Sequence, residues 1–126
     1  MSPVRVVLIE DNNVFREALE LLFGLRPDIE IVASLADGSE AVGVCVRLSP
    51  DVVLIDYRLP GLDGVQATAA ICEAAPGVSV ICLTASVSPR EVDALYEAGA
   101  VACLSKDEHL DDIVAAIHRA AERRAA

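Results

Sequence analysis

Three carboxylates carry the first chemical signal in this chain. Glu10 and Asp11 stand together after an apolar run near the N-terminus, and Asp56 ends a second apolar run. Three carboxylates that converge on one crevice repel one another, so the site costs free energy unless a cation neutralises it, and hard oxygen ligands favour Mg²⁺. We therefore expect a divalent-cation site at these residues. The alternative is that Glu10 and Asp11 only cap the helix that follows them through its free N–H groups.

Two further polar residues, Thr84 and Lys106, follow later apolar runs. Lys106 is the only lysine among ten basic residues. A compact ammonium can reach into a crevice and pair with a phosphoryl oxygen or a carboxylate, and a threonine hydroxyl can donate to a bound oxyanion. The alternatives are an exposed loop lysine and an ordinary β-branched strand residue.

Five short runs rich in Val, Ile or Leu would have to position these groups. They recur about every 25 residues and have the length of strands: Val4 to Ile9, Ile29 to Ser34, Val52 to Asp56, Val78 to Thr84 and Val101 to Leu104. Runs without strict polar alternation suit a parallel sheet that is covered on both faces.

Helices are predicted between and after these runs, at residues 13–24, 39–48, 65–75, 89–98 and 108–123. In the last of them, apolar residues share one face at helical spacing: Leu110, Ile113, Val114, Ile117 and Ala121. Five right-handed βα units predict a flavodoxin-like (βα)5 three-layer α/β sandwich with the parallel order 2-1-3-4-5. Ligands of such sheets bind at the carboxyl ends of strands 1 and 3, where the order reverses, and the polar residues above stand at strand ends.

Length and composition limit the function. A chain of 126 residues is one domain long, and 54% hydrophobic with 24% charged residues excludes disorder. A formal charge of -10 argues against direct binding to nucleic acid. The longest uncharged stretch, Ala74 to Pro89, contains Pro76 and Gly77 and is too short to span a bilayer, so we expect no membrane partner.

The N-terminus favours a cytoplasmic protein, and the cysteines favour neither a metal site nor a disulfide framework. The first eleven residues lack the basic region and cleavage site of a signal peptide. The four cysteines have no C-x-x-C pair, which argues against zinc and a disulfide framework, so we expect four buried small hydrophobes: Cys45, Cys72, Cys82 and Cys103.

Together these residues resemble the receiver domain of two-component response regulators. The resemblance runs from Val4 to about Glu122 and rests on four short stretches: Glu10-Asp11, Asp56 to Gly64 (Asp-Tyr-Arg-Leu-Pro-Gly-Leu-Asp-Gly), Thr84-Ala85 and Lys106-Asp107. Among such CheY-like receiver domains, the NarL/LuxR-type subclass looks closest in three segments: Glu10 to Leu19, Arg58 to Gly64 and Glu97 to Ala100. In that subclass a helix-turn-helix DNA-binding domain usually follows the receiver. Residues 1–126 would be the receiver alone, and Ala120 to Ala126 ends like an opening linker.

The resemblance implies a role for each site residue. Asp56 would accept a phosphoryl group from a sensor histidine kinase, and Glu10, Asp11, Asp56 and the backbone carbonyl of Arg58 would hold Mg²⁺. Lys106 would hold the phosphoryl group, and Thr84 would take the switch role. The chain would be no enzyme beyond its own phosphorylation and dephosphorylation. A homodimer is compatible with the resemblance, and DNA would be a partner only through a C-terminal domain.

One position departs from the family pattern. Members commonly carry an aromatic residue three positions before the lysine, where this chain has Cys103. An aromatic swing at this position therefore cannot couple Thr84 to the output face. Tyr96 in the helix predicted at 89–98 is a candidate substitute, and the loop Ser86 to Pro89 is expected to move that helix directly.

Three other classes of protein can be weighed against a signalling switch. Aspartyl-phosphate phosphohydrolases place a second Asp two residues after the nucleophile, and here that residue is Arg58. A degenerate receiver that only binds proteins would not need the complete set of acidic residues, Thr84 and Lys106. A nucleotide-binding enzyme is disfavoured because neither G-x-G-x-x-G nor a Walker A loop occurs.

Overall fold

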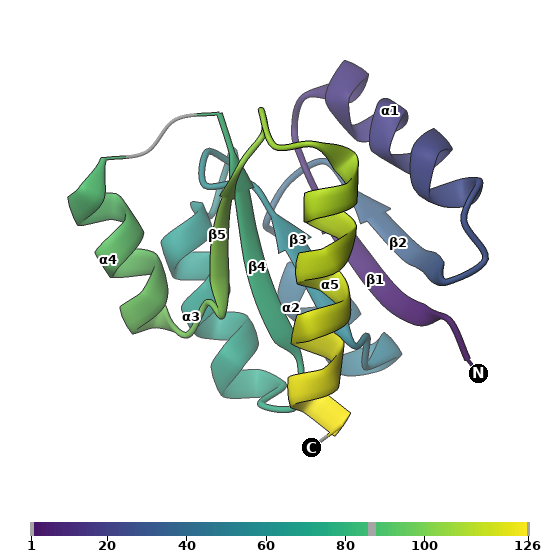
Figure 1. The fold of residues 1–126 in the computed structure, drawn as a ribbon. Helices are drawn as coiled ribbons and strands as arrows, with labels where there is room; N and C mark the ends of the chain where they lie inside the picture. Colours follow the sequence, from purple (N-terminus) through teal and green to yellow (C-terminus); the bar gives the residue numbers. More distant parts are fainter. Residues whose placement is uncertain (1, 86–87, 126) are drawn as a thin grey trace.

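Strands and helices alternate along the whole chain (Figure 1). The structure, a computed structural model, describes residues 2–85 and 88–125. Its elements are β1 (Val4–Ile9), α1 (Asn13–Gly24), β2 (Ile29–Leu35), α2 (Ala41–Leu48), β3 (Val52–Ile55), α3 (Gly64–Ala74), β4 (Ser79–Thr84), α4 (Pro89–Ala98), β5 (Ala102–Ser105) and α5 (Leu110–Ala125). Ser86 and Val87, in the loop expected to move α4, lie outside the described residues.

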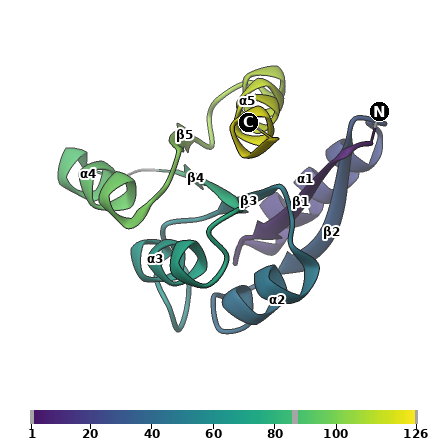
Figure 2. The ribbon, with the colours of Figure 1, turned by 90° about the horizontal axis from the view of Figure 1, so that it is seen from below.

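The strands form one parallel sheet in the order β2-β1-β3-β4-β5, which confirms the predicted topology. Helices α1 and α5 cover one face, and α2 and α3 cover the other, with α4 beside β5 (Figure 2). The order reverses between β1 and β3, where Ile9 pairs with Ile55. The residues that follow this pair, Glu10 and Asp56, therefore start side by side.

Both faces of the central strands are buried, which explains their continuous apolar sequences. Val6 and Leu8 of β1 pack with α1 and α5, whereas Val7 and Ile9 pack with α2 and α3. The predicted face of α5 is confirmed, because its residues Ile113, Val114 and Ile117 are buried and Leu110 and Ala121 pack against them. This packing holds the carboxyl ends of the strands at one rigid edge.

Two of the five helices, α1 and α4, have the predicted bounds. The signals of α4 are local: a capping box of Ser88 and Glu91, Pro89 in the first turn, and Gly99 at φ 118° after its last residue. Strand β1 also has its predicted bounds, and the remaining elements differ from prediction by one or two residues at one or both ends, as where α5 begins at Leu110 and not at residue 108.

One of these differences has a visible cause, and another bears on the site. The helix predicted at 39–48 begins at Ala41, because the carboxylate of Asp37 accepts hydrogen bonds from Ser39 and holds a turn before it. Strand β3 ends at Ile55, so Asp56 lies just beyond the ladder.

No helix among residues 2–85 and 88–125 combines the length and the apolar character needed to cross a bilayer.

Candidate functional site

The three predicted carboxylates meet at the carboxyl ends of β1 and β3. Backbone hydrogen bonds hold them there, since the N–H of Asp56 donates to the carbonyl of Ile9 at 3.0 Å. One carboxylate oxygen from each of Glu10, Asp11 and Asp56 lies within 4.8 Å of the others. Glu10 and Asp56 are buried, at 2% and 6% exposure, whereas Asp11 is exposed.

Lys106 supplies the positive charge that faces this cluster. Its Nζ lies 2.5 Å from Oε1 of Glu10 and 3.1 Å from Oδ2 of Asp56. Its backbone N–H donates to the carbonyl of Thr84 at 2.9 Å, which ties the segment after β5 to the end of β4. The lysine side chain is only 16% exposed, so the reading of Lys106 as an exposed loop residue is wrong.

The burial of opposite charges shifts their pKa values. Burial raises the pKa of Glu10, and the hydrogen bonds from Lys106 and from the N–H of Asn12 oppose this shift only in part. Burial lowers the pKa of Lys106, but its hydrogen bonds to Glu10 and Asp56 outweigh burial, so the pKa of the ammonium is raised overall. The ammonium of Lys106 therefore stays charged beside Glu10 and Asp56.

The first turn of α1 is capped by Asn12 and by neither acid. Oδ1 of Asn12 accepts a hydrogen bond from the N–H of Phe15 at 2.9 Å. Oε2 of Glu10 accepts one from the N–H of Asn12 at 3.0 Å, which orients the glutamate toward the crevice. The alternative in which Glu10 and Asp11 serve only as helix caps is thus contradicted.

The loop after Asp56 is shaped by a close backbone contact. The N–H of Gly64 donates to the carbonyl of Tyr57 at 2.8 Å. A Cβ on Gly64 would lie 2.6 Å from Cα of Tyr57 and 2.8 Å from the carbonyl oxygen of Asp56, so only glycine fits. The N–H of Arg58 points to Oδ1 of Asp56 at 3.3 Å, while the Arg58 side chain is exposed.

Thr84, Tyr96 and Cys103 lie on the β4, α4 and β5 side of this edge. Thr84 is buried at the end of β4. The hydroxyl of Tyr96 accepts a hydrogen bond from the N–H of Cys103 at 3.2 Å, although the tyrosine is 47% exposed. An aromatic side chain thus reaches β5 at the position of Cys103, but it comes from α4.

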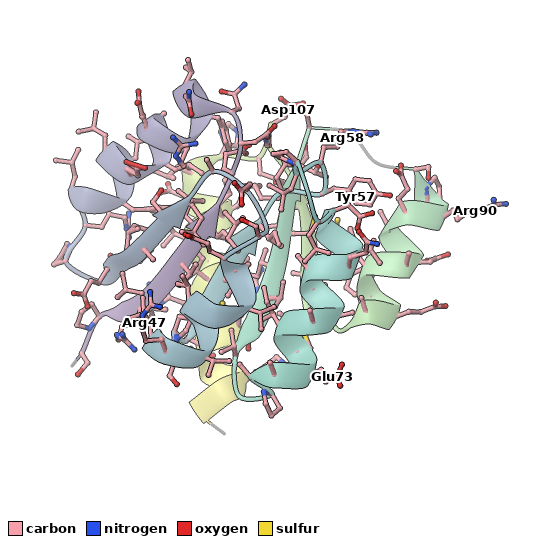
Figure 3. All side chains as sticks on the ribbon, turned by 180° about the vertical axis from the view of Figure 1, so that it is seen from behind. Arg47, Tyr57, Arg58, Glu73, Arg90 and Asp107 are labelled. Atoms are coloured by element: carbon pink, nitrogen blue, oxygen red, sulfur yellow. The ribbon has the colours of Figure 1, made fainter. Side chains whose placement is uncertain are left out.

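Two residues beside the site were not singled out from the sequence. Phe15 of α1 places its ring centroid 4.6 Å from Nζ of Lys106. Tyr57 packs with Cys82, Leu95 and Ala100, and a hydrogen bond with Glu91 of α4 raises the pKa of its hydroxyl. Figure 3 shows Tyr57 on the side of the loop that faces α4, and Arg58 and Asp107 at the edge where the strands end. In the sequence Tyr57 directly follows Asp56, whereas Phe15 lies four residues after Asp11.

The four cysteines are free, but they are not all buried as expected. Cys45 and Cys82 are buried, whereas Cys72 and Cys103 are half-buried. Burial raises the pKa of Cys45 to about 11, and burial also raises the pKa of the other three thiols. The expectation of four buried cysteines is therefore correct for Cys45 and Cys82 and wrong for Cys72 in α3 and Cys103 in β5.

The cluster fits a small hard cation. Three carboxylates supply oxygen ligands only, two of them are held in place by burial and by the sheet, and the third opens to solvent. One ammonium does not balance three carboxylates. The donor set and its charge match Mg²⁺, which binds through a few carboxylates and retains water.

Comparisons with known proteins identify the family of this chain. Residues 6–118 match the family model of the response regulator receiver domain. The transcriptional regulatory protein LiaR of Bacillus subtilis (strain 168) is 38% identical over 119 residues, 94% of this chain and 56% of LiaR. The nitrate/nitrite response regulator protein NarL of Escherichia coli (strain K12) is 27% identical over 120 residues, 95% of this chain and 56% of NarL.

Solved structures give the same result. A two-component response regulator of the LuxR family from Aurantimonas sp. SI85-9A1 superposes with a TM-score of 0.90 at 29% identity, covering 98% of this chain and 88% of that chain. This chain spans about half the length of the curated relatives it matches. The match over residues 6–118 and the similarity to LiaR show that the chain belongs to the receiver domains of bacterial two-component response regulators.

Proposed function

We propose that this chain is a phosphorylation-controlled switch that accepts a phosphoryl group on Asp56 from a sensor histidine kinase. The observation that carries the proposal is a buried Asp56 carboxylate held between Lys106 and the oxygens of Glu10 and Asp11. Phosphoryl transfer needs positioning and charge neutralisation more than covalent chemistry, and this crevice offers both.

In the transfer, an oxygen of Asp56 forms a bond to phosphorus while the bond from phosphorus to the donor nitrogen breaks. The electron pair of that bond stays on the imidazole of the kinase. The Lys106 ammonium, which lies 3.1 Å from Oδ2 of Asp56, stabilises the negative charge of the phosphoryl oxygens. The Thr84 hydroxyl would donate to one of these oxygens.

The proposed cofactor is Mg²⁺. Glu10, Asp11, Asp56 and the backbone carbonyl of Arg58 would hold it, since the three carboxylates converge there and Arg58 follows in the same loop. When bound, the ion neutralises charge on the carboxylates and on the transferred group. Burial holds the carboxylates of Glu10 and Asp56 in place, and the exposed Asp11 would hold the ion from the side that faces solvent.

The downstream parts of the proposal follow the relatives. The receiver would occupy residues 1–126 and regulate transcription through a LuxR-type DNA-binding domain outside them, as a cytoplasmic protein that pairs with its kinase and can form a homodimer. Phosphorylation and dephosphorylation of Asp56 would be its only catalysis. Thr84 would relay the state of Asp56 to the region of Tyr96 and Cys103, which a hydrogen bond already joins.

Incubation with acetyl phosphate and Mg²⁺ tests the proposal. Intact mass should rise by one phosphate, and chelation of Mg²⁺ or the substitution Asp56→Asn should abolish the rise. Asp107→Asn is the matched control, because Asp107 is an exposed carboxylate at the same edge. Labelling that persists in Asp56→Asn, or its absence from the unmodified chain, would overturn the assignment.

A further inference from the structure

The ring of Phe15 is the aromatic neighbour of the site's single ammonium. Phe15 lies in the first turn of α1, where the side chain of Asn12 accepts a hydrogen bond from its N–H. The phenyl ring is half-buried against the core under α1 and α5 and lies 4.6 Å from Nζ of Lys106. The helix cap therefore holds the backbone of Phe15, and core packing holds its ring.

The surroundings of the Lys106 ammonium leave little room for water. An ammonium has three hydrogen-bond donors. Glu10 and Asp56 accept two of them, and the face of Phe15 is the third close neighbour among the described residues. A ring face carries partial negative charge and attracts a cation within about 6 Å, more strongly where water is excluded.

We propose that Phe15 is a positioning residue that keeps the Lys106 ammonium over the crevice. The inference rests on the proposed phosphorylation of Asp56. In the present arrangement Lys106 is paired with Glu10 and Asp56, yet both carboxylates have other tasks in that reaction. When Glu10 binds a cation and Asp56 binds phosphorus, the Lys106 ammonium still has the ring of Phe15 as a partner.

A ring and an aliphatic side chain would act differently here. Leucine at position 15 would preserve the apolar packing under α1, but it has no quadrupole to hold a cation. Tyrosine would keep the ring face and its attraction. The loss of this attraction predicts slower phosphorylation by about threefold to tenfold in Phe15→Leu and nearly full rescue in Phe15→Tyr.

The experiment compares phosphorylation of Asp56 by acetyl phosphate with Mg²⁺ in the unmodified chain, Phe15→Leu, Phe15→Tyr and Phe23→Leu. Phe23 lies on the same helix and is fully buried, so Phe23→Leu makes the same chemical change in the core. We expect slow phosphorylation in Phe15→Leu, and rates close to that of the unmodified chain in Phe15→Tyr and Phe23→Leu. Equal rates in Phe15→Leu and the unmodified chain, or a Phe15→Tyr as slow as Phe15→Leu, would overturn the positioning role.

A spectroscopic readout separates this role from a structural one. Lys106 is the only lysine, so lysine-selective isotope labelling gives one side-chain signal. Its methylene protons beside Nζ should show the ring-current shift of Phe15, retained in Phe15→Tyr and lost in Phe15→Leu. An unshifted signal in the unmodified chain would refute the contact itself. If the signal is shifted but Asp56 takes no phosphoryl group, the proposed function fails and the positioning role fails with it.

Discussion

The two ends of the sheet carry charged clusters of different construction. At the carboxyl end, three carboxylates meet one ammonium, and two of the carboxylates are buried. At the amino end, Asp28 receives two hydrogen bonds from Arg26, at 3.0 and 3.1 Å, and its Oδ2 lies 2.7 Å from Nε2 of His118.

The two clusters differ in the balance of their charges and in their exposure to solvent. At the amino end the carboxylate of Asp28 pairs with the guanidinium of Arg26, and both side chains are 34% exposed. Ion pairs that are accessible to water contribute little to stability. The cluster at the carboxyl end is buried and unbalanced, so it costs stability until a ligand supplies positive charge. A charged cluster that is not neutralised by its own residues therefore marks the functional end.

The largest expected effect comes from removing the cation at the carboxyl end. Lys106→Met should slow phosphorylation of Asp56 by acetyl phosphate by roughly 100-fold or more, because the charge on the phosphoryl oxygens loses its ammonium. Arg26→Met removes a cation at the amino end and should leave the rate unchanged. Comparable losses in both variants, measured by intact mass over time, would erase the distinction between the ends.

The backbone provides the second contrast. Gly64→Ala should lower the free energy of unfolding by about 1–3 kcal/mol, because the new Cβ would overlap the backbone of Asp56 and Tyr57. Gly24, the last residue of α1, has no atom within 4 Å of such a Cβ, and Gly24→Ala should stabilise by about 0.4–1 kcal/mol. Urea unfolding measures both, and a Gly64→Ala as stable as the unmodified chain would show that the loop can relax.

The smallest effect is the pH response of the amino end. The hydrogen bonds from Arg26, and then the one from His118, hold the pKa of Asp28 well below its ordinary value of 3.8. A depressed pKa means that the stability from this group is complete above pH 3.8 and is lost as the pH falls further.

The check is the slope of unfolding free energy against pH from about pH 5 to 3. Asp28→Asn should flatten this slope, since the group that takes up the proton on unfolding is gone. Asp107→Asn, an exposed carboxylate at the opposite end, should keep the slope of the unmodified chain. Identical slopes in all three proteins would show that Asp28 does not contribute to the pH dependence of stability.

Much of the fold was predictable because its signals are local. The apolar runs, the capping box of Ser88 and Glu91 and the turn at Gly99 each act within a few residues, so they fixed the order of elements and the bounds of α4. Placing Glu10 beside Asp56 required only the parallel order of β1 and β3. The acidic part of the site therefore followed from topology.

Contacts between distant side chains could not be predicted in the same way. The pair of Asp28 and His118 joins residues 90 positions apart, and the contact of Phe15 with Lys106 depends on how α1 packs beside the segment after β5. Capping of α1 by Glu10 and Asp11 was only the alternative to a cation site, and Asn12, which caps the helix, was not considered for this role. Such contacts depend on the direction of side chains and on how the elements pack, and the spacing of residue types along the sequence does not show either.

The melting temperature as a function of Mg²⁺ concentration tests the central contrast most directly. An ion that binds only the folded chain stabilises it by about 2.7 kcal/mol at one hundred times its Kd, so the melting temperature of the unmodified chain should rise by several degrees. In Asp11→Asn the rise should be much weaker, without loss of stability in the absence of metal, whereas Asp28→Asn should respond like the unmodified chain. A melting temperature that Mg²⁺ leaves unchanged, or an equal rise in Asp11→Asn, would contradict the claim that the carboxyl end is an open cation site.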